Sequence, residues 1–357
     1  MSLAYVMLTI LWLALIAYAV LGGADFGAGV WDLLYVGNKD VARRRHEFIN
    51  HALGPVWEAN HVWLIFLIVG LFTAFPSVFS TLSIVLFLPF TLALIGIVLR
   101  GAAFIFRVYG TRNDKYGAVV WGGVFSFASI ITPFILGASA AAVASGHIHF
   151  TSTNIQADVT GATWLTPFAI VIGLMAVALC AVLSSVYLSV EAKQAKDTEL
   201  EQVFRLRAII AGAVTAVLGA LGLVLSRSQA PLLWQGLLAH AIPVVIVTML
   251  IGLATAAALF TRHYRIARVL VIIETAGLLG SWGVSQLPYL IPPTVTVESA
   301  ANSPGVLQVL LIGTIIGMAL LLPSLYYLFS VFKLPYPAPG KEEGSATAQN
   351  DSTVKSV

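Results

Sequence analysis

The chain has 357 residues, of which 59% are hydrophobic and only 10% are charged. A soluble domain carries about 25% charged residues, so this composition excludes an ordinary soluble protein and indicates a surface that faces lipid. The net charge of +3 is small, and nucleic acid is not an expected partner. The single cysteine, Cys180, cannot form an internal disulfide.

The hydrophobic segments predict an all-α membrane protein with nine spans. A bilayer core about 30 Å thick requires roughly 20 apolar residues per helix, and backbone groups in lipid must be paired internally. The first segment is expected to be a span and not a signal peptide, because no Lys or Arg precedes Lys39. In chain order, the expected spans are residues 3–34, 53–75, 79–106, 117–144, 163–190, 206–226, 232–260, 265–287 and 306–332.

The basic residues predict the orientation of these spans. All of them except Arg227 lie in odd-numbered connections, at the adjoining helix ends or in the C-terminal tail. Positively charged connections stay in the cytoplasm, so we expect the N-terminus outside and the C-terminus inside. Residues 1–334 are expected to form the membrane domain, and 335–357 a disordered cytoplasmic tail.

Acidic residues inside the spans are functional candidates, because ionisable groups in lipid are costly. They are Asp25, Asp32, Glu58 and Glu274. Asp25 lies among four glycines, which allow helices to approach closely. Glu274 lies near mid-span, where proton handling, quinone contact and a plain buried hydrogen bond are all open.

Polar and aromatic residues surround Glu58 in the segment Gly-Pro-Val-Trp-Glu-Ala-Asn-His-Val-Trp-Leu at 54–64. Glu58 and His61 are three residues apart and share a helix face. We expect Asp25 and Glu58 at a similar depth, because their helices meet the cytoplasmic side near these residues. Such a cluster suits a proton relay, and a hydrogen-bond network without transport is the structural alternative that the residues alone leave equally open.

Metal and haem sites are weaker interpretations of the same residues. The Glu-x-x-His motif formed by Glu58 and His61 lacks the second motif that a di-iron bundle needs, so no metal site is expected. Haem ligation by His61 or His240 would suit a membrane haem protein, but a histidine bonded to a neighbour is the simpler interpretation.

Two segments carry a resemblance to a known family. Gly-Gly-Ala-Asp-Phe-Gly-Ala-Gly-Val at 22–30 and the segment at 54–64 resemble subunit II of cytochrome bd quinol oxidases. The basic connection at 39–45 and the Phe75-Pro76 break resemble that family too. The match is strongest over the first 110 residues or so, and the multi-span layout extends it over nearly the whole chain.

The resemblance implies a fold and a set of partners. The fold would be two four-helix bundles, at about 1–145 and 161–334, with a peripheral helix, packed against a haem-bearing subunit I in a bacterial plasma membrane. The complex would oxidise quinol and reduce oxygen to water with cytoplasmic protons. Two b-type haems and one haem d would lie in subunit I, so this chain is expected to bind none of them; a structural quinone and small single-span subunits are left open.

The resemblance also implies roles for individual residues, none of them catalytic. The acid that follows the second-helix tryptophan, here Glu58, would line a proton path toward haem d, and Asp25 would lie at its cytoplasmic end. Some members carry Asp where this chain has Glu58. The residues expected along the path are Asp25, Glu58, Asn60 and His61, with Trp57 and Trp63 packed beside it.

Two other functions are consistent with these residues. A proton-coupled secondary transporter would use the same carboxylates, but the second half shows no repeat of the Asp25 or Glu58 motif, as an inverted-repeat transporter would. A purely structural membrane scaffold would use neither acid. Copurification with a haem protein, solute flux by this chain alone, and unchanged oxygen reduction in Glu58→Gln are the observations that distinguish the three.

Overall fold

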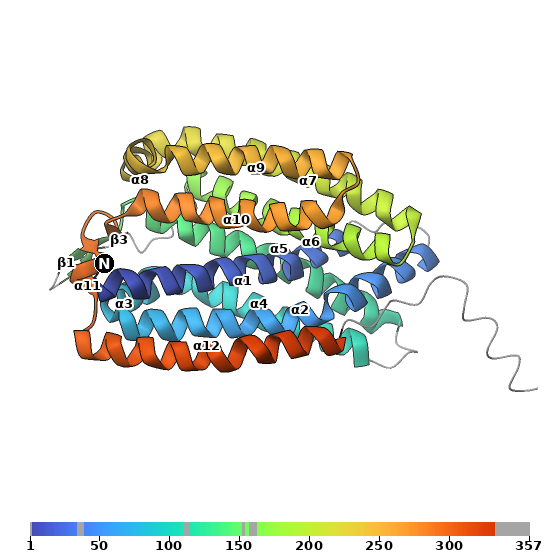
Figure 1. The fold of residues 1–357 in the computed structure, drawn as a ribbon, viewed down its shortest axis with the longest axis horizontal. Helices are drawn as coiled ribbons and strands as arrows, with labels where there is room; N and C mark the ends of the chain where they lie inside the picture. Colours follow the sequence, from blue (N-terminus) through green and yellow to red (C-terminus); the bar gives the residue numbers. More distant parts are fainter. Residues whose placement is uncertain (1, 34–38, 110–114, 152–153, 157–162, 333–357) are drawn as a thin grey trace, which may run out of the picture.

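The computed structural model describes residues 2–33, 39–109, 115–151, 154–156 and 163–332. They form long helices that run side by side along one axis (Figure 1). The first half contains α1 (Leu3–Leu33), α2 (Lys39–Ala74), α3 (Pro76–Val85), α4 (Phe87–Tyr109) and α5 (Lys115–Ala144). The second half contains α6 (Pro167–Gln194), α7 (Thr198–Gln229), α8 (Pro231–Gly236), the π-helical turn η1 (Leu237–Ala241), α9 (Ile242–Phe260), α10 (Tyr264–Gln286), α11 (Val297–Ala300) and α12 (Pro304–Phe332).

The expected polytopic all-α fold is confirmed. Within the described ranges, eight helices are long and apolar enough to cross a membrane, and the bent pair 59–74 and 76–85 makes a ninth span when it is counted as one. The prediction of a single third helix over 79–106 is wrong, because the chain leaves helical geometry at Leu86 between α3 and α4.

The bend between α2 and α3 follows from one proline. The two helices meet at 116°, with Phe75 in a non-helical conformation and Pro76 in the first turn of α3. A proline ring fixes φ and carries no N–H group, so it suits the start of a helix and cannot continue one. The Phe75-Pro76 pair therefore turns the chain at this corner.

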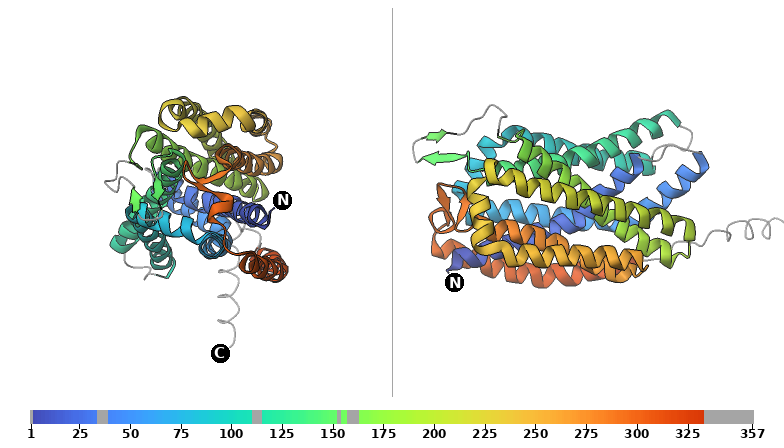
Figure 2. Two further views of the ribbon diagram at one scale, coloured as in Figure 1. Left: turned by 90° about the vertical axis from the view of Figure 1, so that its left-hand side faces the viewer. Right: turned by 90° about the horizontal axis from the view of Figure 1, so that it is seen from above.

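The helices pack as two four-helix bundles and a peripheral helix. One bundle contains α1, α2, α4 and α5, the other contains α6, α7, α9 and α10, and the bundles meet where α6 packs against α1 and α5. α12 packs against α2 and α1 at the edge of the molecule (Figure 2). Lipid-facing helices are covered with exposed Leu, Ile and Val side chains, as expected for a membrane domain.

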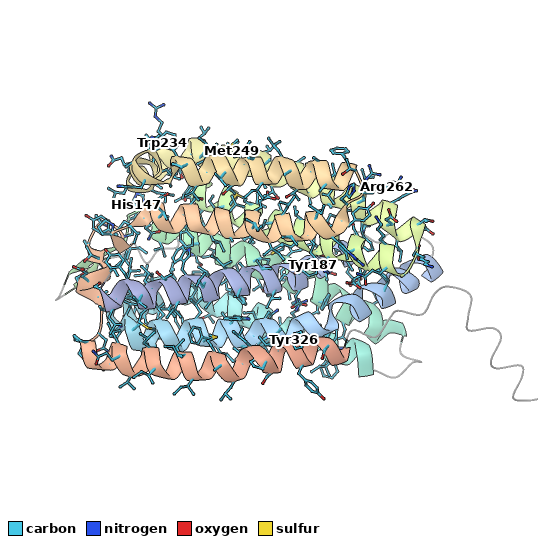
Figure 3. All side chains as sticks on the ribbon, in the orientation of Figure 1. His147, Tyr187, Trp234, Met249, Arg262 and Tyr326 are labelled. Carbon is cyan, nitrogen blue, oxygen red and sulfur yellow. The ribbon has the colours of Figure 1, made fainter. Side chains whose placement is uncertain are left out.

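Both short hairpins lie at the end of the molecule that holds the N-terminus (Figure 1). They pair β1 (His149–Thr151) with β2 (Asn154–Gln156), and β3 (Tyr289–Ile291) with β4 (Val295–Thr296). The sequence predicted only polar connections in these two places. Figure 3 places His147 at this end and Arg262 at the opposite end, so alternate connections lie at opposite ends, in agreement with the alternation of basic residues.

Candidate functional site

An ion pair between Asp25 and Arg100 lies inside the first bundle. Arg100 Nη1 is 2.6 Å from Asp25 Oδ2, and Nη2 is 2.6 Å from Oδ1. Nη2 also donates to the Asp25 carbonyl oxygen at 2.9 Å. Asp25 is only 4% exposed and Arg100 only 3%. This bidentate geometry is the strongest form of carboxylate–arginine contact. It pairs two charges whose burial in a membrane protein would otherwise be costly.

The ion pair joins all four helices of its bundle. Asp25 lies on α1 and Arg100 on α4. Asn60 of α2 donates its Nδ2–H to Asp25 Oδ2 at 2.9 Å, and Arg100 donates its Nε–H to the hydroxyl of Ser129 on α5 at 2.9 Å. One polar side chain from each helix therefore meets at one point, and the position of each helix depends on the other three.

Aromatic rings shield the guanidinium. Its central carbon lies 4.9 Å from the ring centre of Phe26 and 4.8 Å from that of Phe125. A cation over an aromatic face gains about 0.5–2 kcal/mol, and more when water is excluded. These rings therefore add to the stability of the buried guanidinium.

Glycines allow α1 to come so close to its neighbours. A Cβ atom on Gly27 would overlap the backbone carbonyl of Cys180 in α6, and one on Gly29 would overlap the side chain of Ser129 in α5. The backbone of α6 cannot yield without moving the whole helix, so Gly27 marks a direct backbone contact between the two bundles. The glycines around Asp25 thus set the packing that holds its carboxylate beside Arg100.

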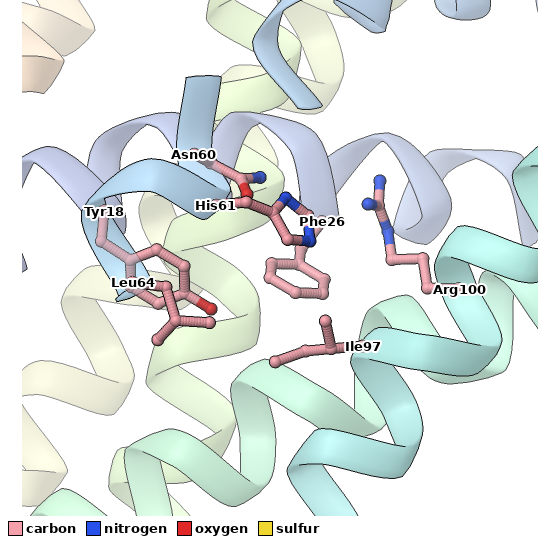
Figure 4. A pocket seen from close by; sticks show the side chains of 7 residues that line it. All are labelled: Tyr18, Phe26, Asn60, His61, Leu64, Ile97 and Arg100. Carbon is pink, nitrogen blue, oxygen red and sulfur yellow. The ribbon is translucent and has the colours of Figure 1, made fainter. Parts of the chain in front are cut away.

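A small cavity adjoins the ion pair (Figure 4). Its volume is about 10 Å³, which is about the size that admits one water molecule. Its lining residues are Tyr18, Phe26, Asn60, His61, Leu64, Ile97 and Arg100. The buried hydroxyl of Tyr18 has no hydrogen-bond partner among the described residues. Since a buried water is held by two to four polar groups, this lining is suitable for one.

The structure brings together three of the residues that the sequence singled out. Asp25 and Asn60 are hydrogen-bonded, and His61 lines the adjoining cavity. Trp63, on the same helix, has a buried indole N–H without a partner among the described residues. The side chains of Glu58 and Trp57 lie outside the described part of α2, so their placement stays a prediction.

Arg100 is the residue that sequence reasoning missed. Its position near the end of the third expected span places it among the cytoplasmic charges that orient the helices, whereas its side chain is buried against Asp25. A signal was present, because Arg100 follows an uninterrupted apolar run and precedes Gly101-Ala102-Ala103-Phe104. A cation with apolar residues on both sides is as costly in lipid as a carboxylate and needs a partner.

Glu274 and His240 lie in the second bundle and not at this site. Glu274 is on α10, and its carboxylate packs against α9 at Gly252, where an added Cβ would come within 3.0 Å of Oε1. His240 is exposed on the π-helical turn η1. Neither therefore takes part in the polar cluster of the first bundle.

Comparison with known proteins identifies the family of the chain and its fold. The family model described as "Cytochrome bd terminal oxidase subunit II" matches residues 3–332. A Bacillus subtilis protein provisionally described as subunit II of a cytochrome bd menaquinol oxidase is 24% identical over 338 residues, which cover 92% of this chain and 95% of that protein. Subunit 2 of the cytochrome bd-I ubiquinol oxidase of Escherichia coli is 25% identical over 58% of this chain and 52% of its own length.

A solved structure has the same fold. A chain of the bd oxidase from Geobacillus thermodenitrificans superimposes with a TM-score of 0.73, and the match covers 93% of this chain and 99% of that one. The two sequences are 22% identical, so the likeness supports the architecture over nearly the full length of both.

Proposed function

The chain belongs to the family of subunit II of cytochrome bd terminal oxidases and is a subunit of a quinol oxidase complex in a bacterial membrane, and we propose that its first bundle helps to carry cytoplasmic protons toward the oxygen-reducing centre. In this proposal subunit I carries the two b-type haems and haem d, and this chain also stabilises that subunit. Quinol and oxygen are the substrates of the complex.

The observation that supports proton transfer is the buried polar cluster in the first bundle. A hydrogen-bonded core alone would be served by neutral side chains, whereas this one holds a full ion pair beside a water-sized cavity and a histidine. Burying a charge is expensive even when it is paired. Ionisable residues inside membrane proteins are therefore a mark of ion and proton pathways.

Each residue has a distinct part in the proposed path. Arg100 fixes the Asp25 carboxylate through two contacts of 2.6 Å, and Asn60 holds one of the same oxygens. His61 borders the cavity and carries nitrogens that can accept and release a proton. Glu58 precedes His61 by three residues, about one helical turn, on the side toward the expected cytoplasmic end of α2.

The dimensions of this site do not fit a haem. A pocket for a cofactor or a drug-sized ligand usually has a volume of about 300–1,000 Å³, whereas the cavity beside His61 has about 10 Å³. The cavity beside His61 is therefore too small for a haem. No step of the proposed proton path therefore runs through a haem bound at His61.

Glu58→Gln is expected to lower quinol-driven oxygen consumption by about a hundredfold, because a positioned acid–base group contributes about 10²–10⁴ in rate. Glu58→Asp should keep most of the activity, because it retains the carboxyl group. The measurement is oxygen uptake by the purified complex with a soluble quinol, normalised to its haem content so that assembly defects are separated from slow turnover.

Glu274→Gln is the matched control. It removes a carboxyl group from a membrane helix in the same way but lies in the other bundle, so oxygen consumption by this variant should remain within about twofold of the parent. If Glu58→Gln turns over as fast as Glu274→Gln, the subunit acts as a scaffold only.

A further inference from the structure

Tyr18 is a polar residue of the first bundle to which the proposed proton path gives no part. It lies on α1 and is only 8% exposed. Its hydroxyl has no hydrogen-bond partner among the described residues. A buried polar group without a partner costs about 1–3 kcal/mol, and buried polar groups are nearly always paired with the protein or with an ordered water. The Tyr18 hydroxyl therefore calls for a partner from outside the described chain.

This hydroxyl faces the small cavity beside the ion pair. Tyr18 precedes Asp25 by seven residues, which is two helical turns and about 10 Å along α1, so both side chains lie on the same face of the helix. In Figure 4 the hydroxyl is directed toward the other residues that line the cavity. The cavity volume of about 10 Å³ is suitable for one water molecule and for no larger ligand.

Arg100 has one hydrogen-bond donor left for this cavity. A guanidinium carries five N–H groups and accepts no hydrogen bond. Its Nε–H donates to Ser129, and one N–H of Nη1 and both of Nη2 donate to Asp25. These four contacts leave the second N–H of Nη1, and Arg100 lines the cavity.

Asn60 supplies an acceptor to the same cavity. An ionised carboxylate can only accept hydrogen bonds, so the contact of 2.9 Å to Asp25 is made by the amide N–H of Asn60. This leaves Asn60 Oδ1 as an acceptor on a residue that lines the cavity. The two remaining polar residues of the lining, Tyr18 and His61, carry groups that can both donate and accept.

We propose that Tyr18 is a positioning residue of the proton path, and that its hydroxyl holds one water molecule in this cavity together with Arg100, Asn60 and His61. The inference rests on the proposed proton transfer through the first bundle. Arg100 fills one lone pair of the water, and Asn60 Oδ1 accepts one of its protons. The remaining lone pair and the remaining proton face Tyr18 and His61.

The hydroxyl of Tyr18 keeps this water in place in both protonation states of His61. When His61 presents a neutral nitrogen, Tyr18 donates to the water and the water donates to His61. When His61 is protonated there, it donates to the water, and the water donates to the Tyr18 oxygen. The water thus has four partners in either state, and it need not move when His61 gains or loses a proton.

Tyr18→Phe removes the hydroxyl and keeps the ring, so it separates the water from the packing. A cryo-EM map of the purified complex, at a resolution that shows ordered waters, should contain a water in this cavity in the parent and none in Tyr18→Phe. Proton uptake in a single turnover with oxygen, followed with a pH-sensitive dye, should slow about tenfold, as expected for the loss of one ordinary hydrogen bond. Quinol should still reduce the haems at the parent rate.

Tyr5→Phe is the matched control. It removes a hydroxyl from the same helix at a position that does not line the cavity, so the water and the rate of proton uptake should both remain as in the parent. A purely structural role of Tyr18 would give the same result in Tyr18→Phe, because a phenylalanine ring fills the same space.

The outcomes that contradict this inference differ from those that contradict the proton path. A cavity without a water in the parent, or a water that persists in Tyr18→Phe, would overturn the inference. Proton uptake at the parent rate in Tyr18→Phe would also overturn it, and if His61→Phe is slow in the same assay, the proton path itself stands. Parent rates in both variants would overturn the path as well.

Discussion

Asp25→Asn is expected to destabilise the subunit by about 3–5 kcal/mol, because it leaves a buried arginine without its counter-charge. The guanidinium of Arg100 has two contacts of 2.6 Å to this carboxylate, and an asparagine offers one neutral oxygen in their place. The measurement is the thermal unfolding of the solubilised complex, together with the yield of assembled complex from equal amounts of membrane.

Two further variants make this result specific. Asp25→Asn combined with Arg100→Gln removes both charges and should recover most of the stability, since replacing a whole buried pair by neutral groups is often close to neutral. Glu191→Gln breaks the pair with Arg268, whose atoms are 3.8 Å apart and whose side chains are 26–30% exposed; it should cost less than about 1 kcal/mol. An Asp25→Asn complex as stable as Glu191→Gln would contradict the importance of the buried pair.

Gly27→Ala is expected to disrupt the contact between the two bundles. The new methyl group would overlap the Cys180 carbonyl of α6, and overpacking of this kind costs about 1–3 kcal/mol, or more where a backbone must move. Since α1 also carries Asp25, the shift should loosen the polar cluster. The unfolding temperature of the complex is the measurement.

Gly212→Ala provides the opposite expectation on a similar helix. At Gly212 of α7 an added Cβ would meet no atom within 4 Å, and alanine in a helix is favoured over glycine by about 1 kcal/mol. Gly212→Ala should therefore match or exceed the parent in stability. If both alanine variants unfold at the parent temperature, the close approach of α1 and α6 at Gly27 is not a tight contact.

The spans, their alternation and the corner at Phe75-Pro76 were predictable from the sequence. Each follows from a property of consecutive residues: apolar length, the position of basic residues, or the missing N–H of Pro76. The split of the third expected span was not predictable in this way, because the residues on both sides of Leu86 are equally apolar and hydropathy does not register a single non-helical residue.

The pairing of Asp25 with Arg100 could be found only in the structure. The two charged residues are 75 positions apart, and nothing in their local sequences states which helices are neighbours. The glycines illustrate the same limit. Gly27 and Gly313 both lie in glycine-rich apolar helices, yet one is in direct contact with another helix and the other borders open space.

Proton uptake during a single turnover of the reduced complex with oxygen tests most directly whether the polar cluster carries protons. In His61→Phe, which keeps an aromatic ring but removes both nitrogens beside the cavity, uptake measured with a pH-sensitive dye should slow about tenfold or more, while quinol still reduces the haems at the parent rate. Proton uptake at the parent rate in this variant would contradict a path through the first bundle.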